Sequence, residues 1–264
     1  ETLKKYHLPS LKTAIIWIHC PQKDNDALSA RKRFSFEEIF FIQLSRQKER
    51  LEYRTHPTFK VEIDHEQIKK FVDRFDFKLT NAQTNSIDQI LKDLSSNSPM
   101  IRLLEGDVGS GKTAVAATVA YATTATRPID YTRGKPFGFG TLQVAYMAPT
   151  EILTKQHFES FIKYFSPRQD VGAGIPISIG LITGSGCFKF PSKSNPTKST
   201  SISRPQLLKW VANGEISVLI GTHALIQKTV RFKHLALVII DEQHRFGVDQ
   251  RLALSRKSTD DLPQ

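Results

Sequence analysis

The chain has 264 residues, of which 39% are hydrophobic and 24% are charged, so it can bury a full core as one large domain or as a domain with a smaller appendage. Its longest apolar runs are far too short to cross a bilayer and its first residues carry no secretory signal, so we expect neither a membrane protein nor a secreted one. The formal net charge of +11 favours a polyanionic partner, nucleic acid before an anionic membrane, although a fragment that lacks an acidic half would show the same excess.

The cysteines and the chain ends give two further expectations. Cys20 and Cys187 lack the CxxC spacing of a zinc site, and we expect free thiols in a reducing compartment. The chain begins at Glu1 without a methionine and ends in polar, irregular sequence, which is typical of a piece of a longer polypeptide.

Residues 1–75 are predicted to form a small helical linker that packs on the main domain. Ser35 and Glu38 have the spacing of a capping box before an apolar pattern of helical period, so we expect a helix at 35–54. A second helix is expected to start at Asp64, with its apolar side chains on one face. The segment carries no nucleotide or metal motif, which favours a connecting role.

Residues 76–264 are predicted to form an α/β domain. Apolar runs predict strands at 100–105, 141–149, 177–183, 215–222 and 235–242. Helical periodicity and capping residues predict helices at 80–94, 111–124, 150–165 and 204–214. Strands that alternate with helices are typical of a parallel sheet covered by helices on both faces.

Two stretches interrupt this alternation. Residues 127–140 and 187–204 are rich in glycine, proline, serine and lysine, and we expect exposed loops, the second a candidate for disorder. The second stretch carries four basic residues and no acidic one. A solvated loop is the favoured interpretation, and a finger that contacts nucleic acid is the alternative.

The segment 106–113 fits the phosphate-binding pattern G-x-x-x-x-G-K-[ST] between a predicted strand and a predicted helix. Glycines allow successive backbone N–H groups to turn around phosphate oxygens, and the N-terminus of the following helix faces the same anion. We expect Lys112 to bind the β- and γ-phosphates of ATP and the Thr113 hydroxyl to join the Mg²⁺ shell. The predicted nucleotide-binding residues of this loop are Gly106, Asp107, Val108, Gly109, Ser110, Gly111, Lys112 and Thr113.

An acidic pair supplies the other half of a nucleotide site. Asp241 and Glu242 follow a buried apolar run, at the carboxyl end of a strand, where ligands bind in open α/β sheets. We expect Asp241 to hold Mg²⁺, directly or through water, and Glu242 to polarise the attacking water. A solvated turn is the alternative, but a phosphate loop at the same end of the sheet favours catalysis by these two residues and Lys112.

Several segments resemble the motifs of superfamily 2 helicases. They are FKLTNAQ at 77–83, APTEIL at 148–153, Thr183–Gly184, GTHALIQ at 221–227 and DEQH at 241–244. The set MAPTEILTKQH, GTHALIQ and DEQHRFGVDQR is similar in particular to the RecG family of branch-migrating bacterial DNA helicases, and the resemblance covers most of the chain. The related transcription-repair coupling factors usually carry DEEQRFGV in the last segment, so Gln243 and His244 favour the RecG family.

The resemblance implies roles for residues outside the phosphate loop. Gln83 would hydrogen-bond the adenine and Phe77 would pack near it, although Thr80 and Gln83 also have the spacing of a capping box, and we favour both roles for Gln83. His244 would couple the nucleotide site to DNA, with a structural histidine as the alternative, and residues 245–247 would have a structural or coupling role.

The resemblance also implies contacts with the nucleic-acid backbone at strand ends, where short polar groups with free N–H donors suit binding that ignores sequence. Thr150 is at the same time a plausible helix N-cap. The residues implied are Pro149, Thr150, Thr183, Gly184, Thr222 and His223.

As a whole, the resemblance implies a RecA-like P-loop NTPase sheet that is the first motor domain of a DNA helicase. The parent enzyme would be a monomeric motor of the bacterial cytoplasm and nucleoid that uses ATP and Mg²⁺ to move branched double-stranded DNA, such as forks and Holliday junctions. Because the chain shows no second RecA-like domain, no arginine finger and no upstream wedge domain, we expect this piece to bind nucleotide weakly and to turn over little.

Three alternatives remain at the level of sequence. A transcription-repair coupling factor shares the motor, an RNA helicase would more often carry DEAD than DEQH, and a nucleotide-gated scaffold would bind branched DNA without translocating.

Overall fold

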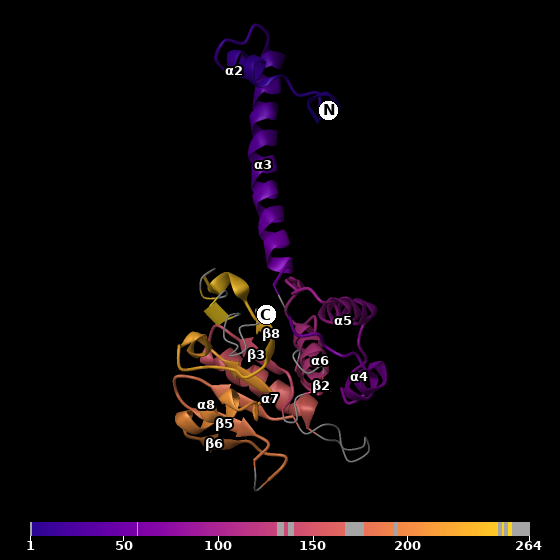
Figure 1. Cartoon of the computed structure of the whole chain (residues 1–264), viewed down its shortest axis with the longest axis vertical. Helices are drawn as coiled ribbons and strands as arrows, with labels where there is room; N and C mark the ends of the chain where they lie inside the picture. The colour runs from indigo at the N-terminus through magenta and orange to yellow at the C-terminus, as the bar shows by residue number, and fades with distance from the viewer. Residues whose placement is uncertain are drawn as a thin grey trace. The chain divides into compact units, whose positions relative to one another are not determined.

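The computed structural model describes residues 2–56, 58–130, 135–136, 140–166, 177–192, 195–247, 250 and 253–254. The chain divides into two compact units, Glu1–Thr55 and His56–Gln264, and Figure 1 shows the elements of each. None of the described helices is both long and apolar enough to span a membrane.

The first unit is helical, as expected, and contains α1 (Thr2–Lys5), α2 (Leu11–His19) and α3 (Asp24–Arg54). Helix α2 packs against α3, which is 31 residues long. The prediction that a helix begins at Ser35 is wrong, because Ser35 lies inside α3. Residues 27–34 are mostly strong helix formers, and the helix therefore extends upstream to Asp24, where the Asp26 carboxylate accepts the backbone N–H of Lys23 at 3.0 Å.

The second unit begins earlier than the predicted boundary at residue 75. Helix α4 (His65–Val72) starts at Asp64 as expected, since the Asp64 carboxylate accepts the backbone N–H groups of the first turn. Phe71 on this helix is fully buried and stacks on Tyr121 of α6 (Lys112–Ala125), with ring centroids 4.2 Å apart. The linker expected at 1–75 therefore contributes its last part to the core of the second unit.

A six-stranded sheet forms the centre of the second unit, and the α/β class predicted from the sequence is confirmed. Its strands lie in the order β6-β5-β4-β7-β3-β8. Strands β4, β7, β3 and β8 are parallel, whereas β5 and β6 add an antiparallel hairpin at one edge. The strands are β3 (Gln143–Met147), β4 (Ile179–Ile182), β5 (Cys187–Phe190), β6 (Thr200–Ile202), β7 (Val218–Gly221) and β8 (Leu235–Ile240).

Helices cover both faces of the sheet, and the alternation of side chains along β3 shows it. Val144 and Tyr146 belong to the buried cluster that contains α4, α5 (Asn81–Leu94), α6 and α7 (Glu151–Phe165). Ala145 and Met147 belong to a second cluster, formed with α8 (Arg204–Ala212) and the 3₁₀ helix η1 (His223–Ile226). Successive strand residues point to opposite faces, so residues 144–147 pack against helices on both sides of the sheet.

The two exposed loops predicted from the sequence both contain strands in the structure. The stretch 187–204 is not one exposed loop, because residues 187–190 and 200–202 form the paired strands β5 and β6, with Cys187 and Phe190 buried. In the stretch 127–140, residues 129–130 and 135–136 form a two-residue antiparallel pair, β1 with β2, and most of the remainder lies outside the described residues.

The strand predicted at 100–105 is absent, and the segment is irregular. Met100 and Leu104 pack partly against the core, but Ile101 and Leu103 are 77% and 59% exposed. The apolar run therefore contacts the domain along one side only, and among the described residues β8 is the edge of the sheet.

One buried amide joins three parts of the sheet. The Gln143 side chain on β3 is fully buried, and its Nε2 donates to the carbonyl oxygens of Val211 and Ile216 at 2.9 and 2.7 Å. Its Oε1 accepts the backbone N–H groups of Lys233 and His234 at 2.8 and 3.0 Å. All four hydrogen-bonding positions of the amide are therefore used to hold the approaches to β7 and β8 beside β3.

We expect Gln143→Ala to lower the free energy of unfolding by about 3 kcal/mol, because the backbone groups of Ile216, Lys233 and His234 lose this partner, whereas the Val211 carbonyl keeps the N–H of Gly214. Urea unfolding followed by circular dichroism measures this change. Gln156→Ala, at an exposed position of α7, is the control and should have little effect. A loss below about 1 kcal/mol for Gln143→Ala would show that water replaces the amide.

Candidate nucleotide-binding site

The loop 106–111 leads directly into α6, as the phosphate-binding pattern requires. Gly109 and Gly111 have φ angles of +82° and +80°, in the left-handed region that favours glycine. At Gly111 a Cβ atom would also clash with Nε2 of Gln83. Gly111 is the N-cap of α6 and has no side chain to occupy the N–H groups of the first turn, so these donors can face an anion.

Lys112 is held against the loop that precedes it. Its ammonium donates to the carbonyl oxygens of Gly106 and Asp107 at 2.6 and 2.9 Å. The cation therefore lies at the mouth of the loop, where phosphate oxygens would exchange with these carbonyls as acceptors.

Gln83 serves the start of α5 and the phosphate loop at once. Its Oε1 accepts the backbone N–H of Thr80 at 2.8 Å and its backbone N–H donates to the Thr80 hydroxyl at 3.3 Å, so the predicted capping box is confirmed. Its Nε2 donates to the carbonyl oxygen of Ser110 at 2.8 Å, which ties α5 to the loop. Phe77 is 44% exposed and stacks on Phe75, so one face of its ring is open. The contact of Gln83 and Phe77 with adenine stays a prediction.

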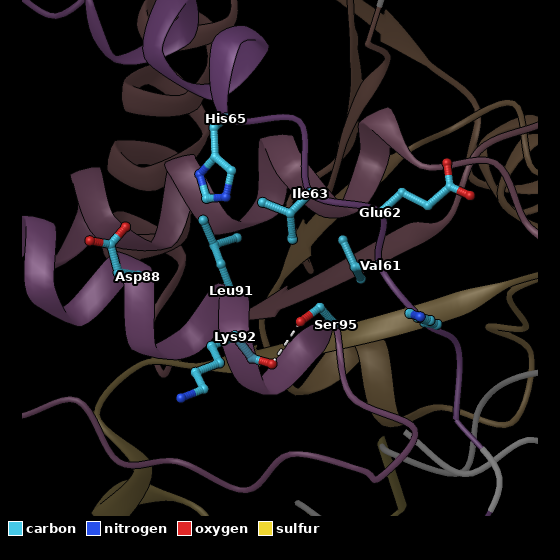
Figure 2. A pocket seen from close by; sticks show the side chains of 9 residues that line it. Val61, Glu62, Ile63, His65, Asp88, Leu91, Lys92 and Ser95 are labelled. Carbon is cyan, nitrogen blue, oxygen red and sulfur yellow. Dashed lines mark hydrogen bonds between the residues drawn. The ribbon is translucent and has the colours of Figure 1, made fainter.

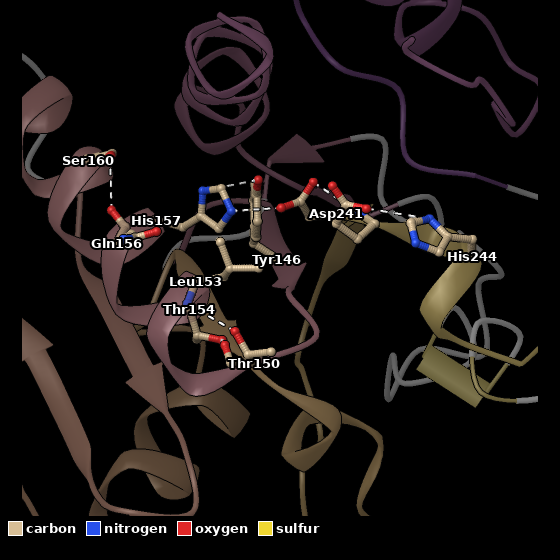
Figure 3. A network of polar contacts seen from close by, with 10 residues as sticks. Tyr146, Thr150, Leu153, Thr154, Gln156, His157, Ser160, Asp241 and His244 are labelled. Atoms are coloured by element: carbon tan, nitrogen blue, oxygen red, sulfur yellow. Dashed lines mark hydrogen bonds and ion pairs between the residues drawn. The ribbon is translucent and has the colours of Figure 1, made fainter. Parts of the chain in front are cut away.

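Asp241 lies at the end of β8, and each of its carboxylate oxygens has a hydrogen-bond partner (Figure 3). Oδ2 is 2.8 Å from Nε2 of His157 on α7, and Oδ1 accepts the backbone N–H of Glu242 at 3.0 Å. The pKa of Asp241 is lowered, first by the hydrogen bond from His157 and also by the charge of Lys112. Helix α6, which begins at Lys112, also packs against β8, so the phosphate loop and Asp241 belong to neighbouring elements.

Glu242 has a left-handed backbone with φ of +52°, which is uncommon for a residue other than glycine. Its carboxylate lies 3.4 Å from Nδ1 of His244, and both side chains are largely exposed. The backbone at Glu242 turns directly after Asp241, so the two carboxylates leave the strand end in different settings, one bound by His157 and the other open to solvent. The coupling role of His244 stays a prediction.

Mg²⁺ fits the residues that are present. The described residues contain no group of three or more histidine, cysteine, aspartate or glutamate side chains that would form an all-protein metal site. Mg²⁺ is usually held by one or two carboxylates together with substrate phosphates, and the 24% exposure of the Asp241 side chain leaves its oxygens accessible. Asp241 and the hydroxyl of Thr113 are oxygen donors of the kind that such a shell needs, and their role as Mg²⁺ ligands stays a prediction.

His157 was not predicted as a site residue from the sequence. It lies on the face of α7 that also carries the buried Thr154, Phe158 and Phe161, and its Nδ1 is 3.4 Å from the hydroxyl of Tyr146. Burial raises the pKa of Tyr146, so this hydroxyl stays protonated. A polar residue on the core-facing side of an amphipathic helix was the available signal, because such a side chain needs a partner inside.

The segments expected to contact nucleic acid follow β3, β4 and β7. Thr150 is exposed and caps α7 by accepting the backbone N–H of Leu153 at 3.2 Å, and the half-buried Pro149 precedes it. Thr183 is buried, and its backbone N–H donates to Gly186 at 3.0 Å, so the expectation of a free donor there is wrong. The sharp turn at 183–186 uses this group internally.

The remaining segment has one buried and one exposed residue. Thr222 is buried and its hydroxyl caps η1, whereas the neighbouring His223 is exposed and follows the end of β7.

Phe246, just past the acidic pair, is buried in the second hydrophobic cluster, in keeping with the structural role expected for residues 245–247. Because β4, β7, β3 and β8 are parallel, their carboxyl ends lie on the same side of the sheet. The segments that follow them therefore lie on that side, together with Asp241.

A cavity of about 660 Å³ lies elsewhere, between the segment 60–65 and α5 (Figure 2). His65, Asp88 and Lys92 are among its lining residues, and none of the predicted site residues is. The phosphate loop is therefore not part of this cavity.

We expect Gly111→Ala to weaken nucleotide binding far more than Gly109→Ala. Both substitutions strain a left-handed backbone by about 1 kcal/mol, but only the first drives a Cβ into the amide of Gln83, since no atom lies within 4 Å of a Cβ at Gly109. Equilibrium binding of a fluorescent ATP analogue measures both effects. The cost of Gly111→Ala should fall in a Gln83→Ala background, and equal costs in the two backgrounds would contradict the clash.

Comparison with known proteins agrees with the site. The DEAD/DEAH box helicase family matches residues 80–263. The ATP-dependent DNA helicase RecG of Staphylococcus aureus is 40% identical over 97% of this chain, and that of the cyanobacterium Synechocystis is 38% identical over the same share. The chain spans 32% and 27% of these two relatives, so it corresponds to about a third of their length or less.

A solved structure of RecG bound to a three-way DNA junction is similar in fold as well. It matches 93% of this chain and 29% of its own, with 36% identity and a TM-score of 0.69. The phosphate loop, the acidic pair at the end of β8 and the match over 80–263 agree, and the chain belongs to the DEAD/DEAH box helicase family.

Proposed function

We propose that the chain is the first motor domain of an ATP-dependent DNA helicase that remodels branched DNA in repair and recombination. The observation that carries this proposal is the combination of a complete phosphate loop at the start of α6 with an acidic pair at the end of β8, a strand that α6 contacts. The likeness to RecG helicases over nearly the whole chain supports the choice of branched double-stranded DNA as the partner.

The residues of the candidate nucleotide-binding site have different proposed roles in ATP hydrolysis. Lys112 and the first-turn N–H groups of α6 would bind the phosphates, and Thr113 and Asp241 would hold Mg²⁺. When bound, Mg²⁺ neutralises charge on the β- and γ-phosphates. Glu242 would orient the attacking water and accept a proton from it, and the exposure of its carboxylate to solvent supports this role.

The polar segments after β3, β4 and β7 are the proposed track for the DNA backbone. Thr150, Gly184 and His223 are exposed there, and the net charge of +11 favours a phosphate-rich partner. We further propose that a second RecA-like domain of the same polypeptide completes the nucleotide site, and that the whole protein works as a monomeric motor at the bacterial nucleoid.

The test is ATP turnover by the full-length protein with linear duplex DNA and with a model fork. We expect strong stimulation by the fork and its loss in Lys112→Ala. We expect Glu242→Gln to lower kcat by about 10²- to 10⁴-fold and to leave ATP binding intact, because a general base acts after binding. Turnover that DNA does not stimulate would contradict a helicase and leave an ATPase with another client.

A second test concerns the hairpin of β5 and β6. The Lys189 ammonium lies over the ring of Trp210, 5.0 Å from its centroid, so it is already engaged within the domain. We therefore expect Lys189→Met to leave the salt dependence of fork binding by the full-length protein unchanged. A slope that flattens by about 0.9 would instead identify Lys189 as a phosphate contact.

A further inference from the structure

Helix α7 reaches both the nucleotide site and the segments proposed to contact DNA. At its start, Thr150 is the N-cap, and Oε1 of Glu151 accepts the backbone N–H of Ser185 at 3.2 Å. That oxygen would lie 2.8 Å from a Cβ at Gly184, so the carboxylate packs closely on the turn after β4. About 9 Å further along the helix axis, His157 contacts Asp241.

The imidazole of His157 is oriented from both sides (Figure 3). An ionised carboxylate only accepts, so Nε2 of His157 carries the proton that is shared with Oδ2 of Asp241 at 2.8 Å. The hydroxyl of Tyr146, on a ring that is only 3% exposed, lies 3.4 Å from Nδ1. A side chain anchored in this way fixes the direction of the carboxylate that it contacts.

We propose that His157 is a positioning residue for Asp241 and that α7 transmits DNA engagement at Thr150 and Gly184 to the Mg²⁺ site through it. The inference rests on the proposed function. In this arrangement a displacement of the start of α7 changes the contact between His157 and Asp241, because both ends belong to one continuous helix. Outer partners of metal ligands typically contribute 10- to 100-fold to metal affinity or activity.

The first experiment measures binding of a fluorescent ATP analogue to the full-length protein, in EDTA and across a Mg²⁺ titration. His157→Phe keeps an aromatic ring and removes the donor, His157→Gln keeps an N–H near the position of Nε2, and Glu159→Ala changes an exposed position of the same helix. We expect His157→Phe to raise the half-saturating Mg²⁺ concentration about 10-fold with unchanged affinity in EDTA. His157→Gln should recover most of this loss, and Glu159→Ala should match the wild type.

The second experiment measures stimulation of ATP turnover by a model fork at saturating Mg²⁺. We expect His157→Phe and Glu151→Ala to lose most of the stimulation by the fork. The first removes the contact of α7 with Asp241, and the second removes its contact with Ser185. Glu151→Ala should keep the wild-type dependence on Mg²⁺ in the binding assay, since it contacts the turn at Ser185 and not Asp241.

Two results would overturn the inference. A wild-type Mg²⁺ dependence in His157→Phe would show that His157 does not position Asp241, and a parallel loss of affinity in EDTA would show that it only supports the fold. A wild-type protein that the fork does not stimulate would instead refute the proposed function, while the Mg²⁺ titration would still report on His157.

Discussion

The parallel pairing of β4, β7, β3 and β8 is the constraint on which the candidate site depends. The carboxyl ends of parallel strands lie on the same side of a sheet, so the segments that follow these four strands all begin on that side. The turn at Thr183, the cap at Thr222, the start of α7 and the acidic pair are all such segments. The buried amide of Gln143 holds β3 to the approaches of β7 and β8, and thereby supports the alignment of three of the four ends.

Much of this arrangement could be predicted from the sequence, because the relevant signals are local. The phosphate loop, the capping box of Thr80 and Gln83 and the apolar runs of the parallel strands each depend on a few neighbouring residues, and the structure contains the corresponding elements. The predicted start of α3 at Ser35 is wrong because the residues upstream of this capping residue are strong helix formers, and the helix begins at Asp24 instead.

The features that escaped prediction depend on partners distant in sequence. The pairing of β5 with β6 and the irregular course of 100–105 are decided by which strand edges are available, and periodicity does not report this. His157 and Asp241 are 84 positions apart, and Gln143 bonds residues at least 68 positions away. Polar contacts of this kind follow only once the sheet order is known. The roles of the predicted site residues toward adenine and DNA depend on ligands and stay predictions.

In the structure, the charged groups of the site already have partners. Lys112 is bound to loop carbonyls, Asp241 to His157 and a backbone N–H, and Glu242 lies near His244. Binding of Mg²⁺ and nucleotide would therefore exchange one set of hydrogen-bond and ionic partners for another, and its net free energy would be the difference between two satisfied states. This difference in free energy is sensitive to modest shifts of the helices and strands that carry the hydrogen-bond partners. Helix α7 carries one of them and also borders the segments after β3 and β4, and the proposed coupling of DNA engagement to Asp241 rests on this double contact.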